Sequence, residues 1–324
     1  MKGIVEAVPN FSEGRDKDKI DRIMATFHRH PEIKLLSVEP DADYNRTVVT
    51  LIGNPDPMHD ALLDLVGVAA REIDLNHHHG EHPRMGAVDV IPFIPVKDLT
   101  MEDCVLCAQK LGQAISERYD IPVFLYAEAA SKPDRMLLPT IRKGEFEGMK
   151  EKIKQPEWKP DFGKAEIHPT FGAVAVGARP FLVAFNIDLE SKDEKPANAI
   201  AKAIRKSSGG FQYVQAGPAF LDARGHVQVT MNILDYKKNP LYRIFETVRV
   251  EARRFQVKVT SSEIIGLIPE DALTQSLDYY LQAEGLTIKA KTFSRKEQVA
   301  LGIKYLLFRD FDETKLIEYY LEQV

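Results

Sequence analysis

The stretch VQAGPAFLDARGHVQVTMNIL, from Val214 to Leu234, decides the fold of the second half of this 324-residue chain. It contains two runs of β-forming residues, Val214–Leu221 and Val227–Leu234, on either side of the turn-like segment Asp222-Ala-Arg-Gly225. Two such runs joined by a short connection that contains glycine predict a β-hairpin. We therefore expect two antiparallel strands at this point of the chain.

The segments around the hairpin complete a β-α-β-β-α-β order. Before it, Phe181–Leu189 is typical of a strand and Glu194–Ile204 of a helix. After it, the apolar spacing predicts a helix over residues 241–255, followed by a strand over Val257–Ile264. This is the split order of ferredoxin-like domains. The last 55 residues are expected to be mostly helical, with Pro269 as a start signal.

The first 94 residues predict the same order. Their expected strands are Ile4–Val8, Lys34–Val38, Thr47–Ile52 and Val88–Ile94, and their expected helices centre on residues 20–27 and 58–73. Strands so closely paired in sequence do not suit repeated parallel crossovers. The fold class predicted is therefore α/β, of the α+β sandwich type, with two ferredoxin-like-order subdomains facing each other across a cleft or tunnel. We place them at residues 1–178 and 179–324.

The region between these two β-α-β-β-α-β segments, residues 95–180, is less regular. Thr100, followed by Asp103, is typical of a capped helix that runs to about Tyr119, and Val123–Tyr126 then predicts a strand. Residues 131–171 are rich in Pro, Lys, Glu and Gly, and predict an extended connection with one short helix. A connection this long inside a folded protein is often functional.

Composition excludes several classes of protein. The net charge of −5 and the pI near 6.0 argue against a nucleic-acid partner, which would require a basic face. No apolar run reaches the ~20 residues that cross a bilayer, so no membrane association is expected. Two cysteines are too few for a disulfide scaffold. We expect a cytoplasmic protein of two domains.

The segment NHHHGEHPRMG, residues 76–86, holds four of the nine histidines. It lies in a predicted loop between a helix and a strand, where functional residues often lie. Taken alone, it is equally compatible with a polar connector. A metal site is a third interpretation, although adjacent histidines in a loop do not fix a ligand geometry and Glu81 is the single carboxylate within the segment.

Three further motifs have simpler interpretations. Cys104 and Cys107 lie on a predicted helix around two apolar residues, which favours burial over redox or zinc chemistry. The segment Gly172–Gly177 lacks the Lys-Ser or Lys-Thr of a nucleotide loop, so its glycines predict close backbone approach or a tight bend. Arg46 follows Asn45 at the start of a predicted strand, where its guanidinium is suited to hold a carboxylate.

Several motifs together resemble the formiminotransferase domain, which in animals is fused to a cyclodeaminase. The matching segments, in chain order, are Val8–Gly14 (VPNFSEG), Asn45-Arg-Thr47, Gly80–Gly86 (GEHPRMG), Pro92–Val96 (PFIPV), Cys104–Ala108 (CVLCA), Ala178-Arg179 and Ala184-Phe-Asn186. They are dense over the first 190 residues and thinner afterwards. Their number and order make the resemblance specific.

The resemblance implies a glutamate formimidoyltransferase. Such an enzyme moves the formimino group of N-formimidoyl-L-glutamate to tetrahydrofolate, giving 5-formimidoyltetrahydrofolate and L-glutamate in histidine degradation. It implies two α/β subdomains around a folate-binding tunnel, tetrahydrofolate as co-substrate without a metal, and a homodimer. His82 matches the catalytic position, whereas His77 and His79 depart from the family pattern. The implied folate-binding loop is Gly163, Lys164, Ala165, Glu166, Ile167, His168, Pro169, Thr170, Phe171 and Gly172.

The chemistry agrees with this assignment. The attacking nitrogen must lose a proton and the departing glutamate nitrogen must gain one, and histidine suits both steps. Both substrates carry carboxylates, so Asn10, Asn45, Arg46 and Arg84 are the substrate-binding candidates. Three alternatives stay open: an N-formylglutamate–tetrahydrofolate formyltransferase, a metal-dependent amidohydrolase built on residues 77–82, and a non-catalytic folate-binding protein.

Overall fold

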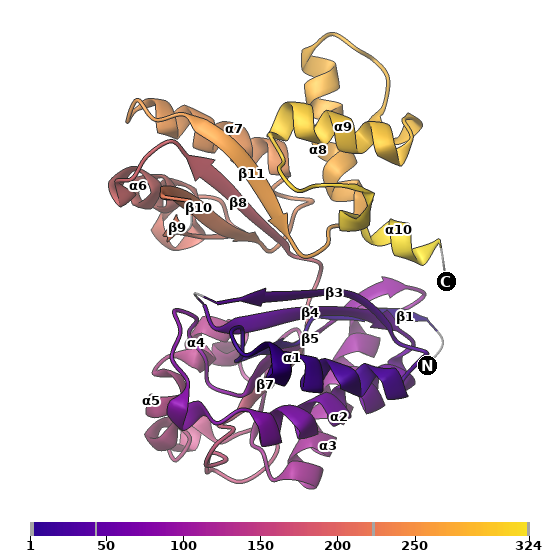
Figure 1. The fold of residues 1–324 in the computed structure, drawn as a ribbon, viewed down its shortest axis with the longest axis vertical. Helices are drawn as coiled ribbons and strands as arrows, with labels where there is room; N and C mark the ends of the chain where they lie inside the picture. Colours follow the sequence, from indigo (N-terminus) through magenta and orange to yellow (C-terminus); the bar gives the residue numbers. More distant parts are fainter. Residues whose placement is uncertain (1–2, 43, 222–223, 323–324) are drawn as a thin grey trace. The chain divides into compact units, whose positions relative to one another are not determined.

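A four-stranded antiparallel sheet organises the second half of the chain in the computed structural model, which describes residues 3–42, 44–221 and 224–322 (Figure 1). Its order is β11-β8-β10-β9. The strand bounds are Val183–Leu189 (β8), Val214–Leu221 (β9), His226–Ile233 (β10) and Val259–Ile265 (β11). This confirms the hairpin strands, while the predicted turn residues Asp222 and Ala223 lie outside the described ranges.

Helices complete the predicted ferredoxin-like order in this half. The helices α6 (Glu194–Ile204) and α7 (Leu241–Arg253) follow β8 and β10, and their apolar side chains share one core with the sheet. The C-terminal segment is helical, as expected, with α8 (Glu270–Ala283), α9 (Arg295–Leu306) and α10 (Ile317–Leu321). Pro269 is the N-cap residue of α8, which confirms it as a start signal.

The first half contains a seven-stranded sheet. Residues 4–11 form one interrupted strand, β1 (Ile4–Ala7) and β2 (Asn10–Phe11), and both parts pair with β4 (Arg46–Gly53) and β5 (Val88–Lys97). The strand β3 (Lys34–Asp41) pairs with β4 from the other side. With α1 (Lys17–Met24) and α2 (Pro55–Glu72), these strands give the predicted β-α-β-β-α-β order.

A parallel extension of this sheet was not predicted. The strand β5 pairs in parallel with β7 (Val174–Ala178), which pairs in parallel with β6 (Val123–Ala127), and α3 (Met101–Tyr119) makes the crossover. The sequence did not predict a strand within Gly172–Gly177, where β7 begins at Val174. Close backbone approach was correct: a Cβ on Gly177 would lie 2.4 Å from the carbonyl oxygen of Tyr126.

The region predicted as an extended connection is more helical than expected. It contains α4 (Leu138–Arg142), α5 (Glu145–Lys152) and 3-10 turns at Pro133–Arg135 and Pro156–Trp158. Arg135, only 1% exposed, holds the region together through Asp161 and the backbone oxygens of Glu157 and Lys159. These partners lie more than 20 residues away, so local periodicity does not reveal them.

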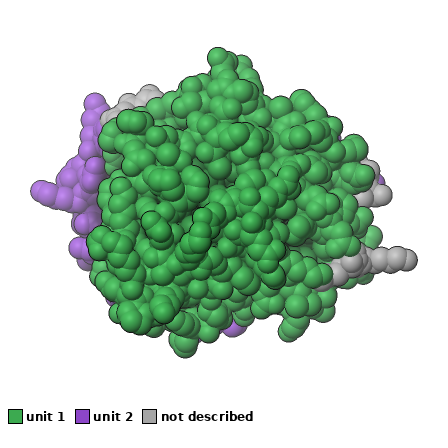
Figure 2. Space-filling view, turned by 90° about the horizontal axis from the view of Figure 1, so that it is seen from below, with its two compact units in different colours: residues 1–180 green, residues 181–324 purple. Residues whose placement is uncertain are grey.

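The packing forms two compact units, residues 1–180 and 181–324, coloured separately in Figure 2. In the first unit, α1, α2 and α3 cover one face of the sheet (Figure 1). Side chains of α4 and α5 form a smaller core with β6 on the other face. Within the described ranges, no helix combines the length and the apolar character that crossing a membrane requires.

The two cysteines lie in α3, which begins with a capping box between Thr100 and Asp103 as predicted. Both thiols are buried, and burial raises the pKa of Cys104 to about 12 and that of Cys107 to about 11. Since the thiolate is the reactive form, neither thiol is activated.

We expect the double variant Cys104→Ala/Cys107→Ala to keep most of its turnover, because both thiols serve packing. Its thermal midpoint should fall, since two buried side chains lose volume. Steady-state kinetics beside a thermal melt check this. Lost activity in a protein that melts as the wild type does would contradict the structural role.

Candidate active site

The four histidines of residues 76–86, which follow α2 and are called the histidine segment, differ in their exposure to solvent. The segment starts in a 3-10 turn, Leu75–His77, and continues without regular structure to Gly86. His77 and His79 are exposed, whereas His78 and His82 are buried, each less than 8% exposed. The sequence does not distinguish these four residues by spacing. Only the packing selects which imidazoles lie inside the protein.

Asn45, directly before β4, is hydrogen-bonded to the histidine segment. Its backbone has a positive φ of 47°, and its side-chain oxygen accepts from the Gly14 amide at 2.9 Å. Its side-chain nitrogen donates to the carbonyl of His79 at 2.9 Å, and its own carbonyl lies 2.9 Å from Nε2 of His78. All of these contacts are within the protein, so they position the loop.

Arg84 has its donors engaged by other side chains. Its Nε donates to Nδ1 of His78 at 3.2 Å, which leaves Nε2 of His78 to donate to Asn45. Its two terminal nitrogens lie 2.9 Å from a Glu145 oxygen and 2.7 Å from a Glu147 oxygen. Arg84 therefore ties the histidine segment to α5.

His82 lies in a positively charged, desolvated position. Burial is the largest cause that lowers its pKa, to about 2, and the charges of Arg142 and Arg46 follow. His78 and Arg84 lower it further. In the free protein the imidazole is therefore neutral at physiological pH, and the same causes disfavour its protonation.

Arg142, at the end of α4, is a site residue that sequence reasoning missed. Its guanidinium pairs with Asp89, which is 1% exposed and also accepts the Met85 amide at 2.7 Å. Lys152 donates to the carbonyls of Thr140 and Ile141 at 2.8 Å each, which caps the last turn of α4. The helix α4 thus places a cation near His82, which lies 60 positions earlier in the chain.

The other predicted site residues have separate settings. Asn10 lies in β2, half-buried, with its side-chain nitrogen on the carbonyl of Val8 at 3.0 Å. Arg46 begins β4, and its guanidinium carbon lies 5.5 Å from the ring centre of Tyr44. Arg46 and Arg84 lie close enough to His82 for their charges to lower its pKa. The Asn45 side chain holds the histidine segment through its hydrogen bond to the carbonyl of His79.

The segment Gly163–Gly172 joins the histidine segment at its C-terminal end. Gly172 forms a bridge with Gly86, and the Ala87 amide donates to the carbonyl of Phe171 at 2.8 Å. Phe171 is fully buried, while residues 164–166 and 169 are exposed. The predicted folate loop therefore presents its N-terminal part to solvent and anchors its other end beside residues 85–87.

A second buried polar group lies on the same sheet. Glu6, in β1, is 4% exposed, and burial raises the pKa of its carboxyl to about 7 against the opposing charge of Arg179. Tyr126 in β6 is hydrogen-bonded with Arg179, and its pKa is raised by burial. The only signal in the sequence is a glutamate within the apolar run IVEAV.

Glu6→Gln is expected to remove a pH dependence of stability. The pKa of this carboxyl is raised on folding from 4.5 to about 7, so its stabilising contribution is complete below pH 4.5 and is lost as the pH rises through 7. The variant should gain on the order of 3 kcal/mol over the wild type at pH 8 and little at pH 4.5. Urea unfolding at both values measures this, and an equal difference at both would contradict it.

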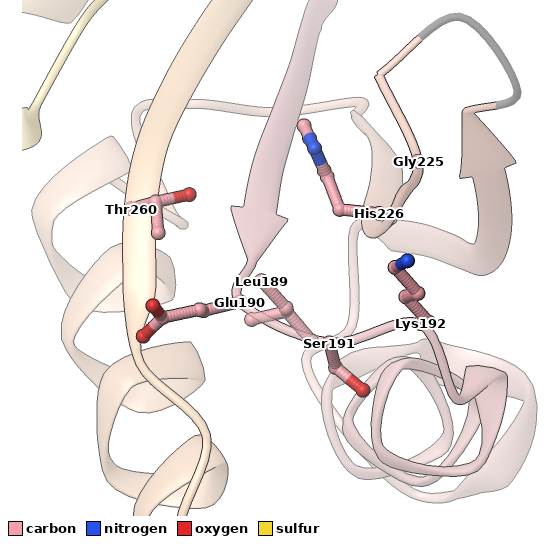
Figure 3. A pocket seen from close by; sticks show the side chains of 7 residues that line it. All are labelled: Leu189, Glu190, Ser191, Lys192, Gly225, His226 and Thr260. Carbon is pink, nitrogen blue, oxygen red and sulfur yellow. The ribbon is translucent and has the colours of Figure 1, made fainter.

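A separate cavity of about 380 Å³ lies in the second unit. Figure 3 shows its lining residues at the end of β8, at the start of β10 and on β11. Its ionisable side chains, Glu190, Lys192 and His226, carry charges of both signs. None of the site residues predicted from the sequence lines it.

No group of three or more metal-ligating side chains comes together in the part of the chain that the structure describes. In this segment, His77 and His79 are exposed, whereas His78 and His82 are buried. Of the two buried imidazoles in this segment, His82 is the one whose pKa the charges of Arg142 and Arg46 lower.

The chain is similar to known proteins over nearly its whole length. Residues 4–179 match the N-terminal subdomain of the formiminotransferase domain, and residues 184–322 match the formiminotransferase domain. The chain is 47% identical to a glutamate formimidoyltransferase of Streptococcus pyogenes serotype M1, over 88% of this chain and 95% of the relative. It is 45% identical to one of Thermoplasma acidophilum, over 93% and 99%.

A fused relative matches as well. The chain is 42% identical to the formimidoyltransferase-cyclodeaminase of Mus musculus, over 89% of this chain and 54% of that protein. The two domain models, and the high identity to relatives that the match covers almost completely, lead to one assignment. The chain belongs to the formiminotransferase family.

Proposed function

We propose that this protein is a glutamate formimidoyltransferase, which transfers the formimino group of N-formimidoyl-L-glutamate to tetrahydrofolate and releases L-glutamate. Membership of the family supports the reaction class. The observation that carries the proposal is the setting of His82, a buried and neutral imidazole among the guanidinium groups of Arg46, Arg84 and Arg142. Such a setting suits a reaction between anionic substrates that requires a proton acceptor.

His82 is the proposed proton-transfer residue. Tetrahydrofolate, when bound, supplies the nitrogen that attacks the amidine carbon. The neutral imidazole accepts the proton which that nitrogen loses, and returns it to the departing glutamate nitrogen. The surrounding guanidinium groups attract the carboxylates of the substrates. They also disfavour protonation of His82 before a substrate binds.

The roles of the folate loop and of the substrate-binding residues are proposed from the family resemblance and from the charged side chains near His82. We propose that the folate lies along Gly163–Gly172, whose exposed residues are accessible. Unpartnered buried N–H groups on Arg46 and Arg142 fit the carboxylates of a glutamate moiety. Asn10 is proposed to contact substrate, whereas Asn45 and Arg84 are proposed to act by positioning, because their polar atoms are engaged within the protein. We also propose that the protein is a cytoplasmic homodimer. Each chain would fold as two domains, near residues 1–178 and 179–324.

A turnover assay tests the function and separates it from its nearest rival. The purified protein is incubated with tetrahydrofolate and either N-formimidoyl-L-glutamate or N-formyl-L-glutamate, and glutamate release is followed. We expect release with the formimino donor. Release with the formyl donor alone would identify the formyltransferase instead. Release with either donor in the absence of tetrahydrofolate would identify a hydrolase.

A further inference from the structure

Two arginines near His82 have unused hydrogen-bonding capacity. Among the described residues, the Nε atoms of Arg46 and Arg142 are buried without a hydrogen-bond partner. A buried donor without a partner loses the free energy of its hydrogen bond to water, so an acceptor that reaches it is favoured. Both guanidinium groups also lie close enough to lower the pKa of His82 by charge.

Arg84 does not share this property. Its Nε donates to His78, and its terminal nitrogens are held by Glu145 and Glu147 on α5. Two carboxylates already neutralise its charge. Of the three arginines around His82, Arg84 is thus the one whose donors are engaged by the protein itself.

Space is present at Arg142. This side chain lines a cavity of about 190 Å³ together with Pro83, Pro139 and residues 143–145. Pro83 follows His82 directly, so the cavity borders the catalytic segment. A single water needs roughly 10–15 Å³ by the same measure, and the cavity therefore admits a larger group such as a carboxylate.

The charges that face His82 come from three parts of the chain. Arg46 belongs to β4, His78 and Arg84 to the histidine segment, and Arg142 to α4. Asp89 on β5 pairs with Arg142, while Glu145 and Glu147 on α5 pair with Arg84. Desolvation and the guanidinium groups together keep the imidazole neutral in the free protein.

We propose that Arg142 and Arg46 form a carboxylate site beside His82, and that a carboxylate bound there allows the His82 imidazole to hold a proton. An arginine fork matches the two oxygens of a carboxylate. A bound anion offsets the guanidinium charges, so the pKa of His82 rises on binding. By reciprocity, protonation of His82 tightens carboxylate binding. This inference rests on the proposed function, which supplies glutamate carboxylates from both the donor and the folate tail.

The test uses the full-length protein with labelled histidine and needs no turnover. Nuclear magnetic resonance follows the His82 ring from pH 4 to 9, free and with saturating N-acetyl-L-glutamate, which mimics the donor. A second arm uses p-aminobenzoyl-L-glutamate, which mimics the folate tail. We expect His82 to stay neutral throughout this range in the free protein, and to show a titration within the range when a ligand is bound. Affinity should increase as the pH falls.

Variants separate the charge of Arg142 from its packing. Arg142→Met alone would leave Asp89 buried and unpaired, so it is combined with Asp89→Asn, which keeps an acceptor for the Met85 amide. This double variant should bind the probe about tenfold more weakly or worse, and should lose the ligand-linked shift of His82. Arg142→Lys should keep the shift and lose part of the affinity. Arg118→Met, on the exposed side of α3, is the matched control and should behave as wild type.

The outcomes are distinct from those of the turnover assay. A shift with one probe assigns the site to the donor or to the folate tail, and a shift with both supports a site for either carboxylate. Unchanged affinity in a folded double variant, or a His82 titration that neither probe moves, would overturn the proposal. Failure of the proposed one-carbon transfer would leave these binding results unaffected.

Discussion

Replacing His82 by alanine is expected to lower turnover by on the order of 10² or more, because the reaction loses the group that takes and returns the proton. The imidazole is buried and neutral in the free protein, so its removal deletes no ion pair on which the fold depends. Folate binding should be largely kept, since His82 acts on the transition state more than on ground-state affinity. Steady-state kinetics and a separate folate-binding titration measure the two effects.

Two neighbouring histidines provide matched controls for this result. His77 and His79 lie in the same segment but are exposed to solvent. His77→Ala and His79→Ala should therefore be mild. If either variant were damaged as severely as His82→Ala, the assignment of a single proton-transfer residue would fail.

Chelation distinguishes the metal-dependent amidohydrolase. Prolonged treatment with a chelator should leave the rate of the wild type unchanged under the transfer mechanism. Loss of activity on chelation with rescue by zinc, accompanied by comparable damage from several histidine variants, would instead support the hydrolase and contradict the role of His82 proposed here.

Gly172→Ala is expected to cost on the order of 3 kcal/mol or more in the free energy of unfolding. Gly172 has a φ of 85°, and an added Cβ would lie 2.1 Å from the carbonyl oxygen of Met85. That carbonyl accepts the amide of Ala173, and the Gly86–Gly172 bridge joins the same two segments. Turnover should fall as well, because the added Cβ would push the histidine segment and the segment Gly163–Gly172 apart.

Two other glycines separate the causes of this effect. Gly148, in α5, has ordinary φ and open space around a Cβ, so Gly148→Ala should stabilise by about 0.5–1 kcal/mol. Gly209 has a φ of 90° with no atom within 4 Å of a Cβ, and Gly209→Ala should cost about 1–2 kcal/mol from backbone strain alone. Urea unfolding of the three variants measures the costs. If Gly172→Ala cost no more than Gly209→Ala, close packing against Met85 would not matter.

The sequence by itself determined the elements that depend on local patterns. The helix at residues 194–204, the strand at 214–221 and the capped helix that ends at Tyr119 were predicted at or within one residue of their observed bounds. Their apolar periodicity, capping residues and turn glycines act between neighbours in the chain. The family, and with it the choice of His82, also followed from short motifs that the sequence shows directly.

Tertiary structure alone decided which charges surround His82. The charge of Arg142 acts on His82 from α4, a helix whose position periodicity did not predict, and its partner Asp89 lies in a strand 53 positions earlier. The difference between Arg84, whose donors are engaged, and Arg46, whose Nε is unpartnered, depends equally on residues distant in sequence. The physical reason is that desolvation and charge act through space, so a pKa or an unfilled hydrogen bond is a property of the folded arrangement and has no local signal.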